Sequence, residues 1–353
     1  MRPLLSIYFI LSLLFATSCE EPFDPVFLIK EARVIAIIAT PPEAHPGEEV
    51  TLSPVIVSPE GTLSNNDFNV QWWRCPDDER DPLADDSLCG ASARIDLGSD
   101  TSFSETLPLD FFPKPEDAQT DSSLFESNEV LLGALLGYWR VIGASLSSNS
   151  EANGNMSAFK RVVIKPQSPL ADLDPSLERL DTLVGPRGDL AKNTNPTLSN
   201  VEIREGNLDG NIVSTLRAGE TYFFIPRADS QSLQVYFELA FDLEGLDIAR
   251  PGLLESFGEV ELLSRFSKAL RCEVPRYSWF VSGGTLVAEN TLDEEILERA
   301  FANLACPKSD RDLQDGSVRF KAPLEAGPLR IWTVMRDGRG GTDVFERTLE
   351  VLP

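Results

Sequence analysis

Few residues of this chain have the types and spacing that catalysis requires. Its 353 residues include one histidine, His45, which lies between Ala44 and Pro46 in a Pro-rich polar turn. Histidine is the usual side chain for acid–base chemistry near neutral pH, so this scarcity argues against most hydrolytic and metal-dependent sites. Ser157-Ala158-Phe159-Lys160 matches the S-x-x-K spacing of one class of serine enzymes, but the companion K-T-G is absent. We therefore expect Ser157 to begin a strand and the protein to be non-catalytic, with a Ser-Lys or carboxylate hydrolase as the alternative.

Acidic side chains crowd the loop between Cys75 and Cys89, where Arg80 is the one base. The carboxylates are those of Asp77, Asp78, Glu79, Asp81, Asp85 and Asp86. Calcium takes about six to eight oxygen ligands, so a constrained loop of this kind could bind it. A solvated acidic loop is the interpretation we favour, because like charges in loops usually face water. No other cofactor is expected.

The N-terminus has the pattern of a targeting segment. Arg2 provides the positive charge, and the apolar run Leu4 to Phe15 is shorter than the roughly 20 residues that cross a membrane. Ala16-Thr17-Ser18-Cys19 resembles the lipobox of bacterial lipoproteins, in which cleavage precedes the cysteine. That resemblance implies that Cys19 carries a diacylglycerol and an amide-linked acyl chain such as palmitate. An ordinary secretory signal, with Cys19 as an incidental thiol, is the competing interpretation.

Charge and cysteine usage fit an exported protein. The formal net charge of −25 offers no basic stripe for nucleic acid. Exported thiols usually pair, and proximity favours Cys75 with Cys89 and Cys272 with Cys306 over the two other connectivities. The first pair would close a loop of about 15 residues, which stabilises by roughly 3 kcal/mol. A zinc site ranks lower because the chain has no C-x-x-C pair beside its single histidine.

The strands that would position the residues described above are predicted from an internal repeat. In this repeat, short runs of aromatic and β-branched residues occur in the same order in both halves of the chain. Gly-Glu turns at Gly47-Glu48 and Gly219-Glu220 each precede a tryptophan-bearing run, at 70–74 and 277–281. A second pair of runs follows at 137–142 and 329–334, and each half closes on a further strand pattern. Runs bounded by turn residues are typical of antiparallel sandwiches. We predict a mainly β protein with two tandem antiparallel, immunoglobulin-like β-sandwich domains and short helical insertions.

The same signals set the expected boundaries. They are a signal peptide (1–18), a lipidated tether (19–29), a first sandwich (30–166), a linker (167–196) and a second sandwich (197–353). A capping box at Thr291-Leu292-Asp293-Glu294 predicts a helix over Leu292 to Ala305. Residues 122–136 and 252–270 fit either helix or strand. The glycines of Gly338-Arg339-Gly340-Gly341 are expected to form a hairpin turn.

Several of these motifs together resemble immunoglobulin-like and polycystic-kidney-disease-type domains. The stretches Arg33-Val34-Ile35-Ala36, Pro41-Pro42-Glu43 and Pro46-Gly47-Glu48, and the closing Met335 to Gly341, are similar to uncharacterised surface lipoproteins of myxobacteria. The resemblance implies a fold and a cell-envelope, outer-membrane location, with no agreed activity. It departs from antibody domains because no cysteine pair could join the two sheets of one sandwich.

The expected function is binding, adhesion or structural work at the cell envelope, with an envelope protein or a glycan as partner. Neighbouring residues of a strand point to opposite faces, so the pairs Trp72-Trp73 and Tyr138-Trp139 should each send one ring outward. An outward ring could be a contact anchor, or it could be covered by an insertion or by the other domain. An accessory subunit of a secretion or motility machine is a further alternative. The sequence does not determine the oligomeric state.

Overall fold

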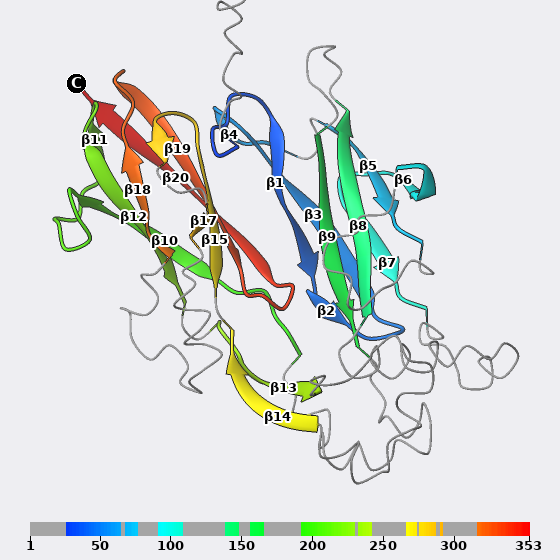
Figure 1. Cartoon of the computed structure of the whole chain (residues 1–353). Helices are drawn as coiled ribbons and strands as arrows, with labels where there is room; N and C mark the ends of the chain where they lie inside the picture. The colour runs from blue at the N-terminus through cyan, green and yellow to red at the C-terminus, as the bar shows by residue number, and fades with distance from the viewer. Residues whose placement is uncertain are drawn as a thin grey trace, which may run out of the picture.

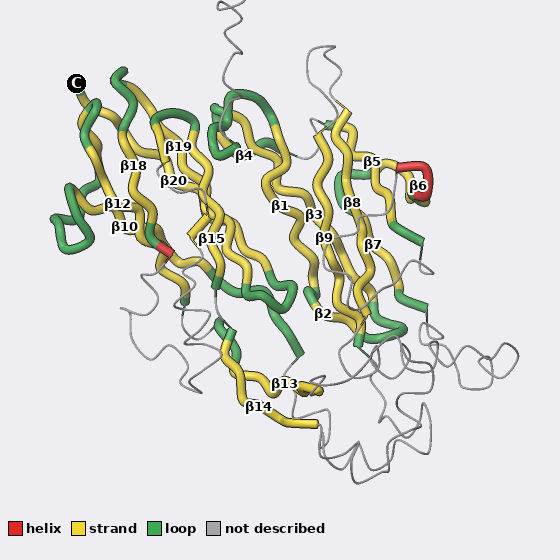
Figure 2. Tube along the Cα trace, in the orientation of Figure 1, coloured by secondary structure: helices red, strands yellow, loops and turns green. Residues whose placement is uncertain are grey.

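The computed structural model describes residues 26–64, 68–76, 91–108, 138–147, 156–165, 192–229, 232–241, 266–273, 275–286, 290–291 and 316–353. Nearly every element in these ranges is a strand (Figure 2), which confirms the predicted mainly β class. No helix among the described residues is both long enough and apolar enough to cross a membrane. The helix predicted at 292–305 and the ambiguous segment 122–136 lie outside the described residues.

The first sandwich has two sheets. Its strands are β1 (Arg33–Thr40), β2 (Glu43–Ala44), β3 (Glu49–Ser58), β4 (Gly61–Thr62), β5 (Asn69–Arg74), β6 (Ile95–Ser99), β7 (Phe103–Thr106), β8 (Tyr138–Ser147) and β9 (Met156–Ile164). One sheet has the order β1-β3-β4, with β7 also paired to β3, and the other has the order β2-β9-β8-β5-β6.

The second sandwich repeats this plan. Its strands are β10 (Leu198–Glu205), β11 (Thr215–Arg217), β12 (Thr221–Ala228), β15 (Arg276–Val281), β16 (Thr285–Leu286), β17 (Asn290–Thr291), β18 (Val318–Lys321), β19 (Gly327–Arg336) and β20 (Thr342–Leu352). The sheets have the orders β10-β12-β18-β16 and β11-β20-β19-β15-β17. A separate two-stranded sheet, β13 (Val235–Phe241) with β14 (Phe266–Cys272), lies between β12 and β15 in the chain, so the end of the ambiguous segment 252–270 is strand.

The strand order of each sandwich is immunoglobulin-like. The opening strand divides between the two sheets: β1 pairs antiparallel with β3 while β2 pairs parallel with β9, and β10 and β11 do the same with β12 and β20. The remaining strands form one sheet of the A-B-E type and one of the G-F-C type. The predicted tandem sandwiches are therefore confirmed, with the correction that each contains one short parallel pairing.

A tryptophan on the equivalent strand anchors each core. Trp72 on β5 lies 5.9 Å from Phe103 between ring centroids and donates to the Asp100 carbonyl at 2.9 Å. Trp279 on β15 lies 6.0 Å from Phe224 and donates to the Gly316 carbonyl at 3.2 Å. Both rings are fully buried, and a buried indole keeps its N–H satisfied in this way.

The two sandwiches pack side by side, face against face, so that four sheets form successive layers (Figure 1). The β1-β3 sheet of the first sandwich lies against the β20-β19-β15 sheet of the second, with the remaining two sheets outside. Strand β19 shows why: Leu329 and Ile331 belong to the core of the second sandwich, while Trp332 and Val334 are buried toward the first. Because side chains alternate along a strand, burial on both faces requires a layer on each side.

Candidate functional site

The contact between the sandwiches, which we call the seam, has an apolar centre. It consists of the buried side chains of Ile29, Ile35, Ala36, Val57, Trp332 and Val334. A register shift between Val34 and Ala36 on β1 marks a bulge, and Ile35 and Ala36 both belong to the seam. A bulge inserts one extra residue and lets two neighbours share a face. The bulge thus widens the apolar surface that the first sandwich presents.

The carboxylate of Glu346 lies at one side of the apolar centre of the seam and forms hydrogen bonds there. Glu346 on β20 accepts hydrogen bonds from the Thr62 hydroxyl at 2.6 Å and the Thr62 N–H at 3.2 Å, and from Arg330 at 2.6 Å. Partial burial favours a raised pKa for Glu346, but the bonds from Thr62 and Arg330 outweigh it and lower the pKa. The Trp332 indole also donates to the Thr62 hydroxyl at 3.3 Å. Thr62 and Glu346 therefore connect the two sandwiches through direct hydrogen bonds.

Arg339 joins three segments at the opposite side of the seam. It lies in the β19–β20 turn and donates to Glu43 of β2 at 3.2 Å. It also donates to Glu273, just after β14, at 2.9 Å, and to Gln234, just before β13, at 3.1 Å. Both carboxylates are buried. A planar guanidinium can serve several acceptors at once, which a lysine cannot do with the same geometry.

Asp337 shapes the turn that carries Arg339. It is buried and accepts N–H bonds from Arg339 at 2.7 Å and Gly341 at 2.8 Å, and a side-chain bond from Asn193 at 3.1 Å. Gly338 has a φ of 81°, and a Cβ on Gly341 would lie 2.0 Å from the Asp337 carboxylate. The hairpin turn predicted from these glycines is thus observed, and its sequence is required by both the backbone conformation and the close approach.

Residues assigned to the linker by sequence also belong to the seam. Asn195 donates to the Ala39 carbonyl at 2.8 Å and accepts from the Thr342 N–H at 2.9 Å, and Asn193 is fully buried. The predicted linker, 167–196, therefore contributes Asn193 and Asn195 to the contact between the sandwiches. The asparagines before Pro196 are visible in the sequence. Nothing near Asn195, however, indicates that it bonds to Thr342, 147 residues away.

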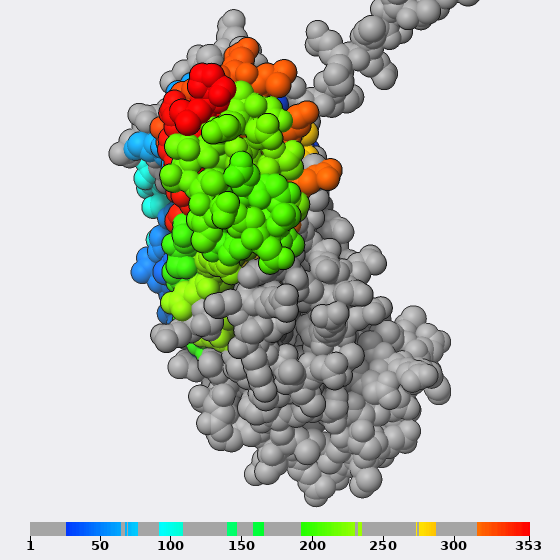
Figure 3. Space-filling view, turned by 90° about the vertical axis from the view of Figure 1, so that its left-hand side faces the viewer, coloured from blue at the N-terminus to red at the C-terminus, as the bar shows by residue number. Residues whose placement is uncertain are grey.

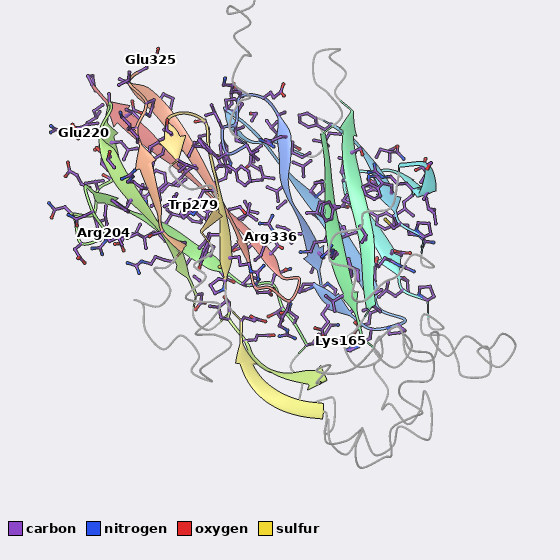
Figure 4. All side chains as sticks on the ribbon, in the orientation of Figure 1. Lys165, Arg204, Glu220, Trp279, Glu325 and Arg336 are labelled. Atoms are coloured by element: carbon purple, nitrogen blue, oxygen red, sulfur yellow. The ribbon has the colours of Figure 1, made fainter. Side chains whose placement is uncertain are left out.

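Lys160 extends from the first sandwich to the second across the seam. From β9 it donates to the Thr342 hydroxyl at 2.7 Å and to the Gly340 carbonyl. Burial lowers the pKa of this ammonium to about 8, assisted by nearby Arg336 and opposed by Asp337. Figure 4 shows Arg336 on the side of the second sandwich that faces the first. Burial likewise lowers the pKa of Arg336.

Glu273 is a buried carboxyl of the seam with a pKa near neutrality. Burial raises its pKa to about 7, and Asp337 adds to the rise, while the N–H of Gln234 and the guanidinium of Arg339 oppose it. A carboxyl whose pKa is raised on folding binds its proton more tightly in the folded state. Its contribution to stability is fully present below its ordinary pKa of 4.5 and is lost as the pH rises through about 7.

We predict that Glu273→Gln flattens the pH dependence of stability. In the wild type this group lowers the free energy of unfolding by up to about 3 kcal/mol between pH 5 and pH 8. The variant has no proton to lose, so its unfolding free energy should change less over the same interval. Urea unfolding of both proteins at each pH measures the difference. Parallel pH profiles would show that Glu273 is not buried as described.

Ion pairs continue from the seam into the first sandwich. Glu43 pairs with Arg339 across the seam at 3.2 Å and with Lys165 of its own sandwich at 3.1 Å. The backbone N–H of His45 donates to Glu48 at 2.8 Å, and its Nδ1 lies 2.8 Å from the Lys165 carbonyl, so these contacts of the single histidine lie within the first sandwich. Glu48 also pairs with Lys192 at 2.6 Å. Among the described residues no group of three metal-ligating side chains comes together. The charged groups of the seam pair with each other, as Arg339 does with Glu43 and Glu273, and these pairs stabilise the contact between the sandwiches.

Both ends of the S-x-x-K pattern, Ser157 and Lys160, lie on β9, in continuous register with β8. The side chain of Ser157 lies outside the described part of the chain. Lys160 donates to Gly340 and Thr342 of the second sandwich.

The predicted contact aromatics have different outcomes. Trp72 is in the first core, and Trp73 points to the outer face of the same sheet but is also buried. Trp73 packs with Cys75, Ala93 and Val141, and the Arg94 guanidinium lies 3.8 Å from its ring centroid. Neither ring is exposed, so both are corrected from contact candidates to packing residues. Tyr138 and Trp139 begin β8, but their side chains lie outside the described part.

The ring of Trp73 packs directly over Gly143, where a side chain would clash with it, and this contact gives a second prediction. A Cβ at this position would lie 2.0 Å from the Trp73 ring, so Gly143→Ala should destabilise the protein by about 1–3 kcal/mol through overpacking. Gly283→Ala is the matched control, because its Cβ would meet its neighbours at 3.7 Å or more. Urea unfolding of the two variants measures the difference. Equal stabilities would contradict the position of Trp73.

The remaining sequence-based sites fall mostly outside the described residues. These are Cys19, the calcium candidates Asp77, Asp78, Asp81, Asp85 and Asp86, and Cys89 and Cys306. Cys75 is disulfide-bonded, as expected for an exported chain, and Cys272 ends β14. The predicted pairings of Cys75 with Cys89 and of Cys272 with Cys306 stay predictions.

No protein-family model matches this chain, and no curated protein matches it. Solved structures with similar folds include the fibronectin(III)-like modules of CbhA from Clostridium thermocellum, at 9% identity and a TM-score of 0.20, covering 91% of this chain and 93% of that one. The Ig1-2 module of the Drosophila receptor tyrosine phosphatase DLAR aligns at 10% identity and 0.21, covering 92% and 100%. Spo0M from Bacillus subtilis aligns at 12% and 0.23, covering 91% of each chain. With TM-scores this low, the immunoglobulin-like assignment rests on the strand order within each sandwich.

Proposed function

We propose that this chain is a non-catalytic, lipid-anchored protein of the cell envelope, in which two immunoglobulin-like sandwiches act as one rigid binding or structural module. The observation that carries the proposal is the seam, whose apolar centre and buried Arg339–Glu43 ion pair join the two sandwiches. Rigid sandwich scaffolds commonly carry binding surfaces on their outer faces and loops.

The lipid anchor rests on the sequence motif at Ala16-Thr17-Ser18-Cys19. The resemblance to myxobacterial surface lipoproteins supports the outer membrane as the location. The net charge of −25 fits a protein that stays soluble beside the membrane and is retained by its covalent lipid.

The seam restricts where a partner could bind. It covers the β1-β3 face of the first sandwich and the β20-β19-β15 face of the second, so a partner must use the outer sheets or the loops. On the outer face of β9, Phe159 is 46% exposed. On the outer sheet of the second sandwich, Glu202 pairs with Arg227 at 2.8 Å and with Arg204. An envelope protein or a glycan could contact either surface.

Two measurements on cells that express the full chain test the proposal. Intact-mass analysis should find mature protein that begins at Cys19 and carries acyl groups, and it should sediment with outer membranes, whereas Cys19→Ser should be released. Crosslinking in intact cells followed by mass spectrometry should then recover a partner through the outer sheets or loops. A bare N-terminus would contradict the anchor. Recovery of a secretion or motility complex would assign the module to that machine.

A further inference from the structure

The N-terminal arm, Val26 to Ile29, is part of the second sandwich even though it precedes the first. The Ile29 N–H donates to the Val281 carbonyl at 2.8 Å, and the Val281 N–H donates to the Phe27 carbonyl at 2.9 Å. Phe27 is buried in the second core, and Ile29 is buried in the seam. The sequence assigned residues 19–29 to a lipidated tether. The last of them, Phe27 to Ile29, pack against the second sandwich beside the end of β15.

This contact lies at one end of the second sandwich, which we call the tip. The tip consists of Val26, the turns at 218–220, 282–284 and 322–326, and the C-terminal Leu352 and Pro353. Hydrogen bonds join its parts: the Gly219 N–H donates to the Pro323 carbonyl at 3.1 Å, and the Ala218 N–H donates to the Leu352 carbonyl at 2.8 Å. In Figure 3 orange and red atoms, which belong to the C-terminal part of the chain, are visible at the top of the molecule.

The tip exposes large apolar side chains close to the entry of the chain. Leu324 is 83% exposed, Val26 is 60% exposed and Leu352 is 43% exposed. Exposed apolar groups gathered at one end of a soluble domain mark a contact surface more often than scattered ones do. Glu220 and Glu325 at the tip are exposed (Figure 4), and exposed Arg217 and Lys321 border its turns, so charges of both signs are present. The tip therefore suits a zwitterionic lipid surface better than an anionic one.

Chain length places this surface at the membrane. Val26, the first residue of the arm, follows Cys19 by seven positions, so the two Cα atoms are at most about 25 Å apart when the chain is fully extended. Strands of ten residues are about 33 Å long, so the opposite end of the sandwich cannot come as close to the bilayer as the tip unless the whole module lies flat. The arm is hydrogen-bonded to β15, so the tether cannot lengthen without breaking these bonds.

We propose that the tip is the membrane-contacting surface of the lipidated protein, with Leu324, Val26 and Leu352 at the headgroup–acyl boundary of a zwitterionic bilayer. This inference rests on the proposed lipidation of Cys19. The tip combines a few exposed apolar groups with charges of both signs, so it acts as a second, weak signal that orients a protein already held by its acyl chains.

The test uses the full-length lipidated protein reconstituted in phosphatidylcholine vesicles that contain a lipid with a doxyl quencher near the headgroup. Leu324→Trp places an indole at the tip. Phe159→Trp places one on the outer face of β9, at a position that is also exposed, and serves as the matched control. After subtraction of the parent fluorescence, we expect the added indole at 324 to be quenched at least twofold more strongly than that at 159. Leu324→Asp should leave vesicle binding intact, because the lipid anchor retains the protein.

The outcomes separate this inference from the proposed function. Strong quenching at 324 alone supports the tip as the contact surface. Equal quenching at both positions, in protein that carries acyl chains and stays on the vesicles, would overturn the tip while the anchor stands. Protein without acyl chains that fails to bind vesicles would overturn the lipoprotein proposal and the tip inference together.

Discussion

Replacing Arg339 with methionine should destabilise the protein by about 3 kcal/mol, because two buried carboxyl groups lose a charged hydrogen-bond donor at once. Two carboxylates, Glu43 and Glu273, lose their guanidinium in this variant, and the Gln234 amide loses a donor. Methionine retains most of the apolar stem, so the loss reflects charge and hydrogen bonding. Urea unfolding at pH 7 measures the change.

Arg204→Met is the control for this result. Arg204 pairs with Glu202 on the outer sheet of the second sandwich, where it is partly exposed to solvent. Exposed pairs contribute about 0–1 kcal/mol, so this variant should remain close to the wild type. If the two arginine variants were equally stable, Arg339 would not be the buried hub that joins β2 to the β13–β14 sheet.

Truncating Trp332 to alanine should cost about 3–5 kcal/mol and should also uncouple the two sandwiches. The indole is fully buried in the seam, outside both sandwich cores. Each core keeps its own residues, so the second core around Trp279 and the first around Trp72 should survive the substitution. Calorimetry should therefore resolve two transitions in the variant and a single cooperative one in the wild type.

Trp332→Phe separates volume from hydrogen bonding at the same position. Phenylalanine keeps most of the apolar surface but loses the bond to Thr62, so this variant should lose only about 0.5–1.5 kcal/mol and keep one transition. Two transitions in the wild-type protein, or an unchanged single transition in Trp332→Ala, would mean that the seam does not couple the domains.

The sandwiches themselves were predictable because their signals are local. Alternating runs such as Arg276 to Val281, bounded by turn residues, indicate a strand with one buried face, and the equivalent tryptophans Trp72 and Trp279 mark matching strands. The glycine-rich turn at Gly338 to Gly341 was predictable for the same reason. Its conformational requirement is contained within five residues of sequence.

The seam was not predicted, although part of its signal is present. Arg33 to Ala39 and Ile331 to Met335 are almost continuously apolar, and such runs indicate strands buried on both faces. The bulge at Ile35 also interrupts the alternation of inward and outward side chains along β1, so the sequence pattern of this strand is harder to recognise. The charged side of the seam has no comparable signal, because Arg339 and Glu43 are 296 residues apart. Nothing local to either residue specifies the other.

Face-to-face packing also explains why the adjacent aromatics mislead. An outward ring on a strand is exposed only where no further layer covers it, and here Trp73 is covered by Ala93 and Arg94, while Trp332 is covered by the first sandwich. Because the seam joins the sandwiches face to face, their two outer sheets stand in fixed relative positions.

A double-mutant cycle between the sandwiches tests the seam most directly. Glu43 and Arg339 belong to different sandwiches and are joined at 3.2 Å. The free energies of unfolding of Glu43→Gln, Arg339→Met and the double variant give their coupling energy. Face-to-face packing predicts a coupling of about 1 kcal/mol or more, as for residues in contact. Effects that add to within about 0.5 kcal/mol, as for sites more than about 10 Å apart, would contradict it.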